Sequence, residues 1–144
     1  MIPVQEERFE YKGYPCVILF MPSGYRCGYV GLPKGTVVRI NDIRCHGGIT
    51  YAENHLYHQE ENDKLWIGFD CGHCFDGYDV AAAKKLYADN PDVLKQITFM
   101  EISGYYTICN QEHPYRTLEY VKSECMKIVD QICGGNDAES IQHK

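Results

Sequence analysis

The sequence predicts an α+β fold, with a twisted, mostly antiparallel β-sheet in the N-terminal half and C-terminal helices packed on it. Between residues 8 and 69, short apolar runs alternate with turns rich in Gly and Pro, which is typical of β-strands. From residue 79 to residue 132, longer segments begin with helix-capping residues. The 144-residue length fits one domain over residues 1–135. The polar tail, residues 136–144, is expected to be disordered.

Strands are expected in chain order at residues 8–11, 16–20, 25–30, 36–40 and 65–69. The second run is apolar throughout, as in a strand buried on both faces. In the last run, Ile67 and Phe69 should share one face, and Trp66 should lie on the other with open space beside it at Gly68. Residues 55–59 fit a strand or a loop, and residues 60–63 fit a polar turn.

Helices are expected at residues 80–88, from residue 91 to just before Phe99, and at residues 118–132, with Asp79, Asn90 and Thr117 as their N-caps. Pro91 suits the first position of the second helix, because its missing N–H would have no partner there anyway. Between the second and third helices, the β-prone residues 105–108 favour a last strand.

The last helix has apolar residues spaced by three and four positions, as in a coiled-coil seam: Leu118, Val121, Cys125, Ile128 and Ile132. One interpretation is packing on the chain's own sheet, where amphipathic helices usually bury their apolar face. The other is a subunit contact, which predicts a homo-oligomer formed through residues 117–132. The sequence leaves both interpretations open.

Charge and apolar content exclude several classes of protein. The net charge is −6 and no Lys and Arg cluster is present, which argues against a long nucleic acid as partner. Residues 1–7 are polar and acidic, unlike a signal peptide. The longest apolar run, residues 16–21, is far too short to cross a bilayer, so no membrane partner is expected. The prediction is a cytoplasmic protein whose eight cysteines are thiols.

Cysteine and histidine residues suggest two kinds of reactive site. Cys45, His46, Cys71 and Cys74 could supply four zinc ligands, although one CxxC pair with an adjacent Cys-His pair is a weak pattern. A Cys-His nucleophile would instead use Cys71 or Cys74 with His46 or His73. The alternative to both is buried thiols beside a hydrogen-bonded histidine. Because both patterns are weak, no metal ligand, cofactor or catalytic residue is assigned.

The loop after the last strand also holds carboxylates. Asp70, His73 and Asp76, with His46, suit general acid–base chemistry and define the alternative of a small hydrolase that acts on a nucleotide signal. The competing interpretation is that an Asp at the end of a strand only caps the following loop.

Two arginines suit an anionic ligand. Arg26 follows Tyr25 on a predicted strand, and Arg116 follows Tyr115 just before a predicted helix. A helix start favours anions, arginine adds a bidentate fork for phosphate, and tyrosine rings can stack on a base. Gly47-Gly48, a hairpin or bulge signal, leaves backbone amides open to a ligand. The alternative for each arginine is an ordinary surface ion pair.

Four segments resemble a family of small proteins carried by phages and prophages: GYRCGYVGLP at residues 24–33, HGGITY at 46–51, WIGFDCGH at 66–73 and YRTLEYVKSE at 115–124. The resemblance extends over residues 8–132. The chain is also similar to the Thoeris anti-defence sponges, which bind cyclic ADP-ribose isomers in pockets between subunits. In the family pattern, the positions of Cys45 and Cys74 need not be cysteine, which disfavours the four-ligand zinc site.

The resemblance implies a phage anti-defence protein that sequesters a cyclic nucleotide immune signal, of the cyclic ADP-ribose type or a cyclic oligonucleotide, without cleaving it. The expected ligand-binding residues are Tyr25, Arg26, His46, Gly47, Gly48, Trp66, Asp70, His73, Tyr115 and Arg116. Besides the hydrolase, a further alternative is a protein-binding inhibitor of a host factor that uses the tyrosine-rich surface and the helix seam.

Overall fold

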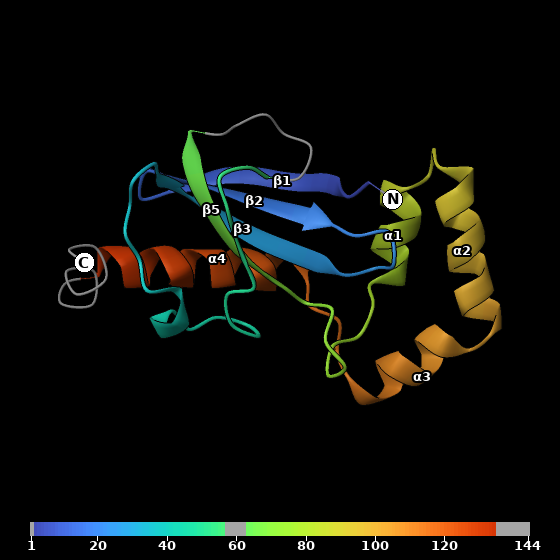
Figure 1. The fold of residues 1–144 in the computed structure, drawn as a ribbon. Helices are drawn as coiled ribbons and strands as arrows, with labels where there is room; N and C mark the ends of the chain where they lie inside the picture. Colours follow the sequence, from blue (N-terminus) through green and yellow to red (C-terminus); the bar gives the residue numbers. More distant parts are fainter. Residues whose placement is uncertain (1, 57–62, 135–144) are drawn as a thin grey trace.

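The computed structural model describes residues 2–56 and 63–134, and the N-terminal half of the chain is a five-stranded sheet (Figure 1). The strands are β1 (Val4–Tyr11), β2 (Tyr14–Phe20), β3 (Arg26–Pro33), β4 (Tyr51–Glu53) and β5 (Lys64–Asp70), in the spatial order β1-β2-β3-β5-β4. Every neighbouring pair is antiparallel. A short 3-10 helix, η1 (Ile40–Asp42), lies between β3 and β4.

The helices that follow in the described residues are α1 (Val80–Leu86), α2 (Pro91–Ile102), α3 (Tyr105–Glu112) and α4 (Leu118–Cys133). Helix α4 packs across one face of the sheet against β2 and β3, whereas α1, α2 and α3 gather at one end of the sheet (Figure 1). The predicted α+β class is therefore confirmed. The predicted N-caps Asp79, Asn90 and Thr117 are confirmed too, since each accepts a hydrogen bond from an N–H of the first turn.

The two faces of the sheet bury different clusters, as the alternation in β5 predicts. Ile67 and Phe69 pack with α4 in the larger core. Trp66 is buried on the opposite face together with Tyr29. The space expected at Gly68 is not open, because a Cβ there would overlap the Tyr29 ring.

Helix α4 directs its apolar seam at the chain's own sheet. Val121, Cys125, Ile128 and Ile132 are fully buried in the core that α4 shares with β2 and β3. Gly28 of β3 allows this close approach, because a Cβ there would lie only 2.8 Å from Cys125 Sγ. Packing on the sheet is thus the interpretation that holds, and the seam offers little surface to a second subunit. A homo-oligomer stays a prediction.

Two predicted strands are wrong. Residues 36–39 are irregular and Ile40 begins η1, because β5 already occupies the second edge of β3, and both Thr36 N and Thr36 Oγ1 donate back to Pro33 O in a turn. Residues 105–108 belong to helix α3, which does not pair with the sheet, and Tyr106 is buried with its hydroxyl donating to Ser23 O. β-Propensity produces a strand only where a partner strand is present.

Element ends also differ from the prediction. β1 begins at Val4 rather than residue 8, and α2 continues to Ile102 instead of ending before Phe99. Residues 57–62, which include most of a predicted strand or loop and polar turn, lie outside the described residues, as does the predicted disordered tail, 136–144. Among the described residues, no helix combines the length and apolar character that crossing a membrane requires.

Candidate functional site

Three segments that are distant in sequence meet beside the start of α4. They are the loop between η1 and β4, the end of β5 with the loop after it, and the first turns of α4. The group that they form consists of His46, Asp70, His73, Asp76, Arg116 and Tyr120, and is called the Asp76 cluster below. Four of these residues, His46, Asp70, His73 and Arg116, lie within the stretches 46–51, 66–73 and 115–124 that the sequence analysis singled out.

Asp76 is the buried centre of this cluster. Its Oδ2 atom lies 3.0 Å from His46 Nε2 and 2.9 Å from His73 Nδ1, and its Oδ1 atom accepts a hydrogen bond from Arg116 Nε at 2.9 Å. Burial alone raises the pKa of this carboxyl, but the hydrogen bonds from His46, Arg116 and His73 outweigh it and lower the pKa of Asp76 to about 2. At neutral pH, Asp76 is therefore an anion that fixes two imidazoles and one guanidinium.

Each imidazole has a second partner on its other nitrogen. His46 Nδ1 lies 2.9 Å from the Tyr120 hydroxyl, and His73 Nε2 lies 3.1 Å from Asp70 Oδ1. The second contact is an ion-pair approach without hydrogen-bond alignment, because the buried Asp70 Oδ1 makes no hydrogen bond in the part of the chain that the structure describes. Both rings are thus held from two sides, which fixes their orientation.

The loop that presents His46 is tied to α4 through its backbone. Arg44 N–H donates to Gln131 Oε1 at 2.8 Å, and Gln131 Nε2 donates back to Arg44 O at 2.7 Å. The His46 N–H donates to the buried carboxylate of Glu124 at 2.7 Å. These three hydrogen bonds fix the position of the loop, and so of His46, relative to α4.

Gly47 and Gly48 form a turn with no strand before it, so the predicted hairpin is wrong. Gly48 N–H donates to Cys45 O at 3.0 Å, and both glycines have positive φ, 72° and 80°. A Cβ at Gly47 would overlap the His73 ring. The turn therefore serves the packing of His73, and the Gly48 amide expected to meet a ligand is engaged within the turn.

Arg26 is only 4% exposed, and each of its three guanidinium nitrogens donates to a protein group. Its Nε and Nη2 donate to Glu6 at 2.7 and 3.1 Å, and its Nη1 donates to Asp79 Oδ2 at 2.9 Å and to Arg116 O at 3.0 Å. Glu6 is the extra residue of a β-bulge in β1, a distortion that re-aims side chains. Arg26 is thus a positioning residue for the site and not the phosphate ligand that we expected.

Trp66 and Tyr25 do not share the site of the Asp76 cluster. Trp66 is 0% exposed and lies on the sheet face opposite α4, because neighbouring residues of a strand point to opposite faces. Tyr25 lines a separate cavity of about 240 Å³ with Asp70 and Tyr51. Asp70 is the residue that contacts both regions, since its carboxylate also reaches His73.

Arg116 is the predicted anion ligand that remains accessible. A quarter of its side chain is exposed, and its Nε is held by Asp76. Within residues 2–56 and 63–134, neither terminal guanidinium nitrogen of Arg116 has a hydrogen-bond partner. Tyr115, beside it, is 44% exposed.

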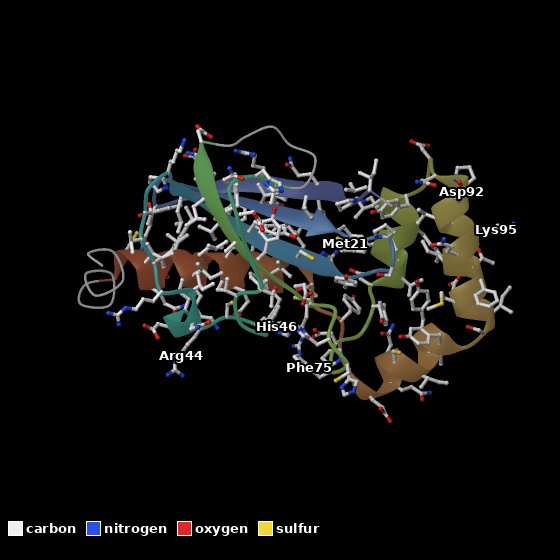
Figure 2. The ribbon with its side chains drawn as sticks, in the orientation of Figure 1. Met21, Arg44, His46, Phe75, Asp92 and Lys95 are labelled. Atoms are coloured by element: carbon white, nitrogen blue, oxygen red, sulfur yellow. The ribbon has the colours of Figure 1, made fainter. Side chains whose placement is uncertain are left out.

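Phe75 is a site residue that the sequence analysis missed. Its ring is stacked on His73 with centroids 4.7 Å apart and an angle of 3°, yet 42% of the residue is exposed. Figure 2 shows Phe75 and His46 close together below the sheet. Tyr120 and Glu124 were missed as well, although their spacing of four places both on one face of the predicted helix, a signal that the sequence contains.

The cysteines do not form the sites considered for them. All eight are free thiols. Cys71 is buried, and this burial raises the pKa of its thiol, which is the opposite of what a nucleophile needs. Among the described residues, the potential metal ligands that converge are His46, His73 and Asp76, and the thiols of Cys45, Cys71 and Cys74 are not part of that group. The four-ligand zinc site is therefore not formed.

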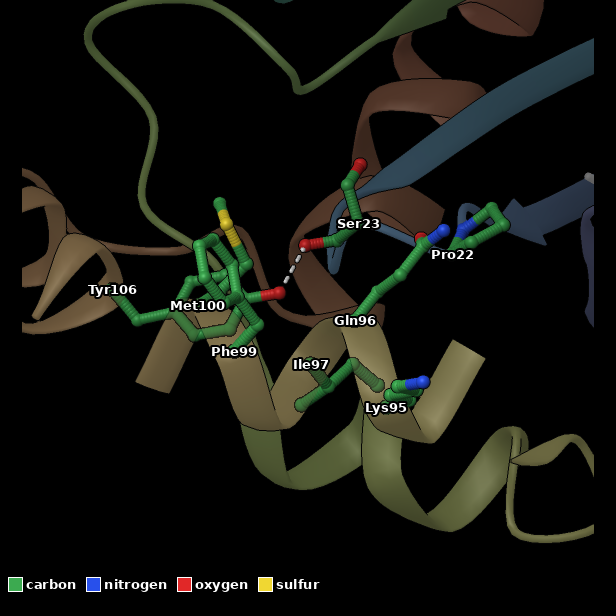
Figure 3. Close-up of a pocket in the computed structure, with 8 residues that line it drawn as sticks. All are labelled: Pro22, Ser23, Lys95, Gln96, Ile97, Phe99, Met100 and Tyr106. Atoms are coloured by element: carbon green, nitrogen blue, oxygen red, sulfur yellow. Dashed lines mark hydrogen bonds between the residues drawn. The ribbon is translucent and has the colours of Figure 1, made fainter. Parts of the chain in front are cut away.

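A second concave surface lies beside α2 and contains no predicted site residue. It has a volume of about 440 Å³ and is mostly apolar, with lining residues that include Ile97, Phe99, Met100 and Tyr106. Figure 3 shows Ser23 bonded to Tyr106 at its edge. Lys95 and Gln96 add the polar groups on α2.

In comparisons with protein-family models, curated proteins and solved structures, no match to this chain is found.

Proposed function

We propose that this chain binds a small anionic ligand of the nucleotide class at the Asp76 cluster and sequesters it without cleavage. By the family resemblance, the ligand is a cyclic nucleotide immune signal, of the cyclic ADP-ribose type or a cyclic oligonucleotide, and the chain is a phage anti-defence protein. The observation that supports binding most directly is the state of Arg116.

Arg116 has the geometry of a phosphate ligand. Asp76 takes only its Nε–H, at 2.9 Å, and the Tyr120 ring lies 5.1 Å from its guanidinium carbon. These two contacts hold the guanidinium plane while its terminal N–H groups are left for a partner. A preorganised fork of this kind loses little entropy on binding a phosphate and makes charge-assisted hydrogen bonds.

Aromatic surface next to Arg116 supports a base as the second part of the ligand. His73 covers one face of the Phe75 ring, so the exposure of Phe75 comes from its other face and its edge. Tyr115 adds a second exposed ring. An aromatic face stacked on a base contributes about 1–3 kcal/mol, whichever base is present.

Two observations favour binding over catalysis. Asp76 is engaged by three donors and has its pKa lowered to about 2, so it is a poor proton acceptor near neutral pH. The Cys71 thiol is buried and its pKa is raised.

A depletion assay tests the proposal. The purified protein is mixed with cyclic ADP-ribose isomers and cyclic dinucleotides, free ligand is measured after ultrafiltration, and the protein is then heat-denatured and the supernatant analysed. Recovery of the intact ligand is the expected result. Recovery of an altered molecule would show an enzyme, and no depletion of any of these ligands would overturn the proposal.

Arg116→Ala is expected to weaken ligand binding at least about tenfold, because hydrogen bonds to charged groups contribute about 1.5–3 kcal/mol. Arg39→Ala is the matched control, since Arg39 is an exposed arginine whose ion pair with Asp42 spans 3.8 Å. Arg116→Lys keeps the charge beside Asp76 without the fork and should recover only part of the affinity. Equal binding by Arg116→Ala and the wild type would remove Arg116 from the site.

A hydrolase is the second candidate, favoured by one observation. The residues assigned to it, Asp70, His73, Asp76 and His46, do lie together in the structure. The altered-ligand outcome of the depletion assay would support it.

A further inference from the structure

We infer that the Asp76 cluster is a binding site for a divalent transition-metal ion, with His46 Nε2, His73 Nδ1 and Asp76 Oδ2 as its protein ligands. This inference does not rest on the proposed function. It concerns the three side chains that point inward, whereas the proposed ligand contacts Arg116 and the exposed rings.

Asp76 Oδ2 lies at the spacing of neighbouring metal ligands from both imidazole nitrogens. The three ligand atoms lie within 4.8 Å of one another, and Asp76 Oδ2 is 3.0 Å from His46 Nε2 and 2.9 Å from His73 Nδ1. Zinc bonds to N and O of about 2.0–2.2 Å separate neighbouring ligands by about 3 Å at right angles and about 3.4 Å in a tetrahedron. The two contacts of Asp76 Oδ2 are within a few tenths of an ångström of these separations, and both ring nitrogens converge on this one oxygen.

The outer nitrogen of each ring lies beside an oxygen atom that could accept its N–H, although only the His46 contact is already aligned as a hydrogen bond. A ligating imidazole donates its other N–H to a carboxylate or another acceptor, which fixes the tautomer. His73 Nε2 has Asp70 at 3.1 Å, and His46 Nδ1 has the Tyr120 hydroxyl at 2.9 Å. Arg116 Nε bonds to Asp76 Oδ1, so Oδ2 is the oxygen that faces both rings.

Without a cation, His73 is in conflict with its neighbours. A neutral imidazole has one N–H, so either its Nδ1 lone pair faces the Asp76 carboxylate or its Nε2 lone pair faces that of Asp70. The buried Asp70 Oδ1 that faces His73 Nε2 has no hydrogen bond in the described residues, so this side of the ring is incompletely paired. A metal ion on Nδ1 resolves the conflict, because Nε2–H can then donate to Asp70. A doubly protonated His73 would also resolve it, and the experiment below separates the two.

The ligand set indicates the class of ion. Two imidazoles and one carboxylate suit zinc, cobalt and nickel better than calcium or magnesium, which prefer oxygen ligands. Three protein ligands leave at least one coordination position for water or for an oxygen atom of an anion.

The site is tested on the full chain after treatment with a chelator and dialysis. Zinc titrated by calorimetry should bind with a stoichiometry of about one, and cobalt should give d–d absorption without thiolate charge-transfer bands. His73→Asn should weaken zinc binding at least about 100-fold, and Tyr120→Phe, which keeps all three ligands, about 10–100-fold. His113→Asn, a histidine whose side chain is 35% exposed beside Glu112, should bind like the wild type.

Several results would overturn the inference. The first is a wild-type protein that binds neither zinc nor cobalt, as expected if His73 is simply doubly protonated. The second is a His73→Asn variant that binds zinc as tightly as the wild type. Loss of binding in a Cys45→Ser, Cys74→Ser double variant would also overturn it, because it would place the ion on thiolates. Circular dichroism checks that each variant is folded, and Tyr120→Phe decides the outcome if His73→Asn does not fold. None of these readouts uses a nucleotide, so failure here leaves the depletion assay intact.

Discussion

Arg26 and Arg116 are joined by one hydrogen bond, from Arg26 Nη1 to Arg116 O at 3.0 Å, yet their surroundings differ completely. Arg26 is buried, and Glu6 and Asp79 take up its charge. Arg116 is partly exposed and gives one N–H to Asp76. Arg26 fixes the backbone of Arg116 through this hydrogen bond, whereas the terminal nitrogens of Arg116 are available to a ligand. The number of donors left without a protein partner therefore separates the buried Arg26 from Arg116, the arginine that we propose as a ligand contact.

The largest effect is expected for Arg26→Ala, which should lower the free energy of unfolding by about 3–5 kcal/mol, because it leaves two nearly buried carboxylates without their partner. Urea unfolding measures the loss. Arg116→Ala, in the more exposed pair, should cost clearly less. A free energy of unfolding for Arg26→Ala within about 1 kcal/mol of the wild-type value would contradict this contrast between the two arginines.

Acid should weaken the region around Arg116 in a defined pH window. The pKa of Asp76 is lowered to about 2 from its usual value of 3.8, so the folded state binds fewer protons than the unfolded state between these values. The stabilisation is present above about pH 4 and is lost as the pH falls toward 2, a loss of about 2 kcal/mol.

Urea unfolding at pH 5 and at pH 2.5, in the wild type and in Asp76→Asn, measures this contribution. The variant lacks the titrating group and should lose less stability over the same interval. Parallel losses in the two proteins would show that Asp76 is not the group that titrates.

The smallest effect on stability is expected for Phe75→Ala. The ring is 42% exposed and its stack on His73 contributes about 1 kcal/mol or less to folding. Its effect on ligand binding should be larger, about 1–3 kcal/mol, because a stacking face is lost. Phe99→Ala, a 70% exposed phenylalanine on α2, is the control and should leave the depletion of ligand unchanged. A larger loss in Phe99→Ala would move the site to the groove beside α2.

Much of the fold could be predicted because its signals are local. Asp79, Asn90 and Thr117 cap helices through bonds to residues three positions later, and the alternation around Ile67 follows from the geometry of a strand. Predictions were wrong where the outcome depended on a distant partner. Residues 36–40 and 105–108 have β-prone sequences, but neither segment pairs with a strand of the sheet.

The site divides in the same way. His46, Asp70, His73 and Arg116 were identified by residue type and motif, and the structure brings them together around Asp76. Trp66 was expected at the ligand site but lies on the opposite face of the sheet from the Asp76 cluster. Its own face was correctly predicted, but the face on which the cluster forms depends on where α4 packs. Phe75 offers no local signal, since its role follows from the position of the His73 ring.

The sequence by itself determined the α+β class, the helix caps and the set of polar residues from which a site can be built, because these depend on neighbours within a few positions. Only the tertiary structure decided which arginine is buried and which is open. That outcome depends on a bulge that turns Glu6 toward Arg26 and on a buried Asp76 that takes one N–H of Arg116. Burial and pairing are properties of contacts between distant segments, and these form only when the chain is folded.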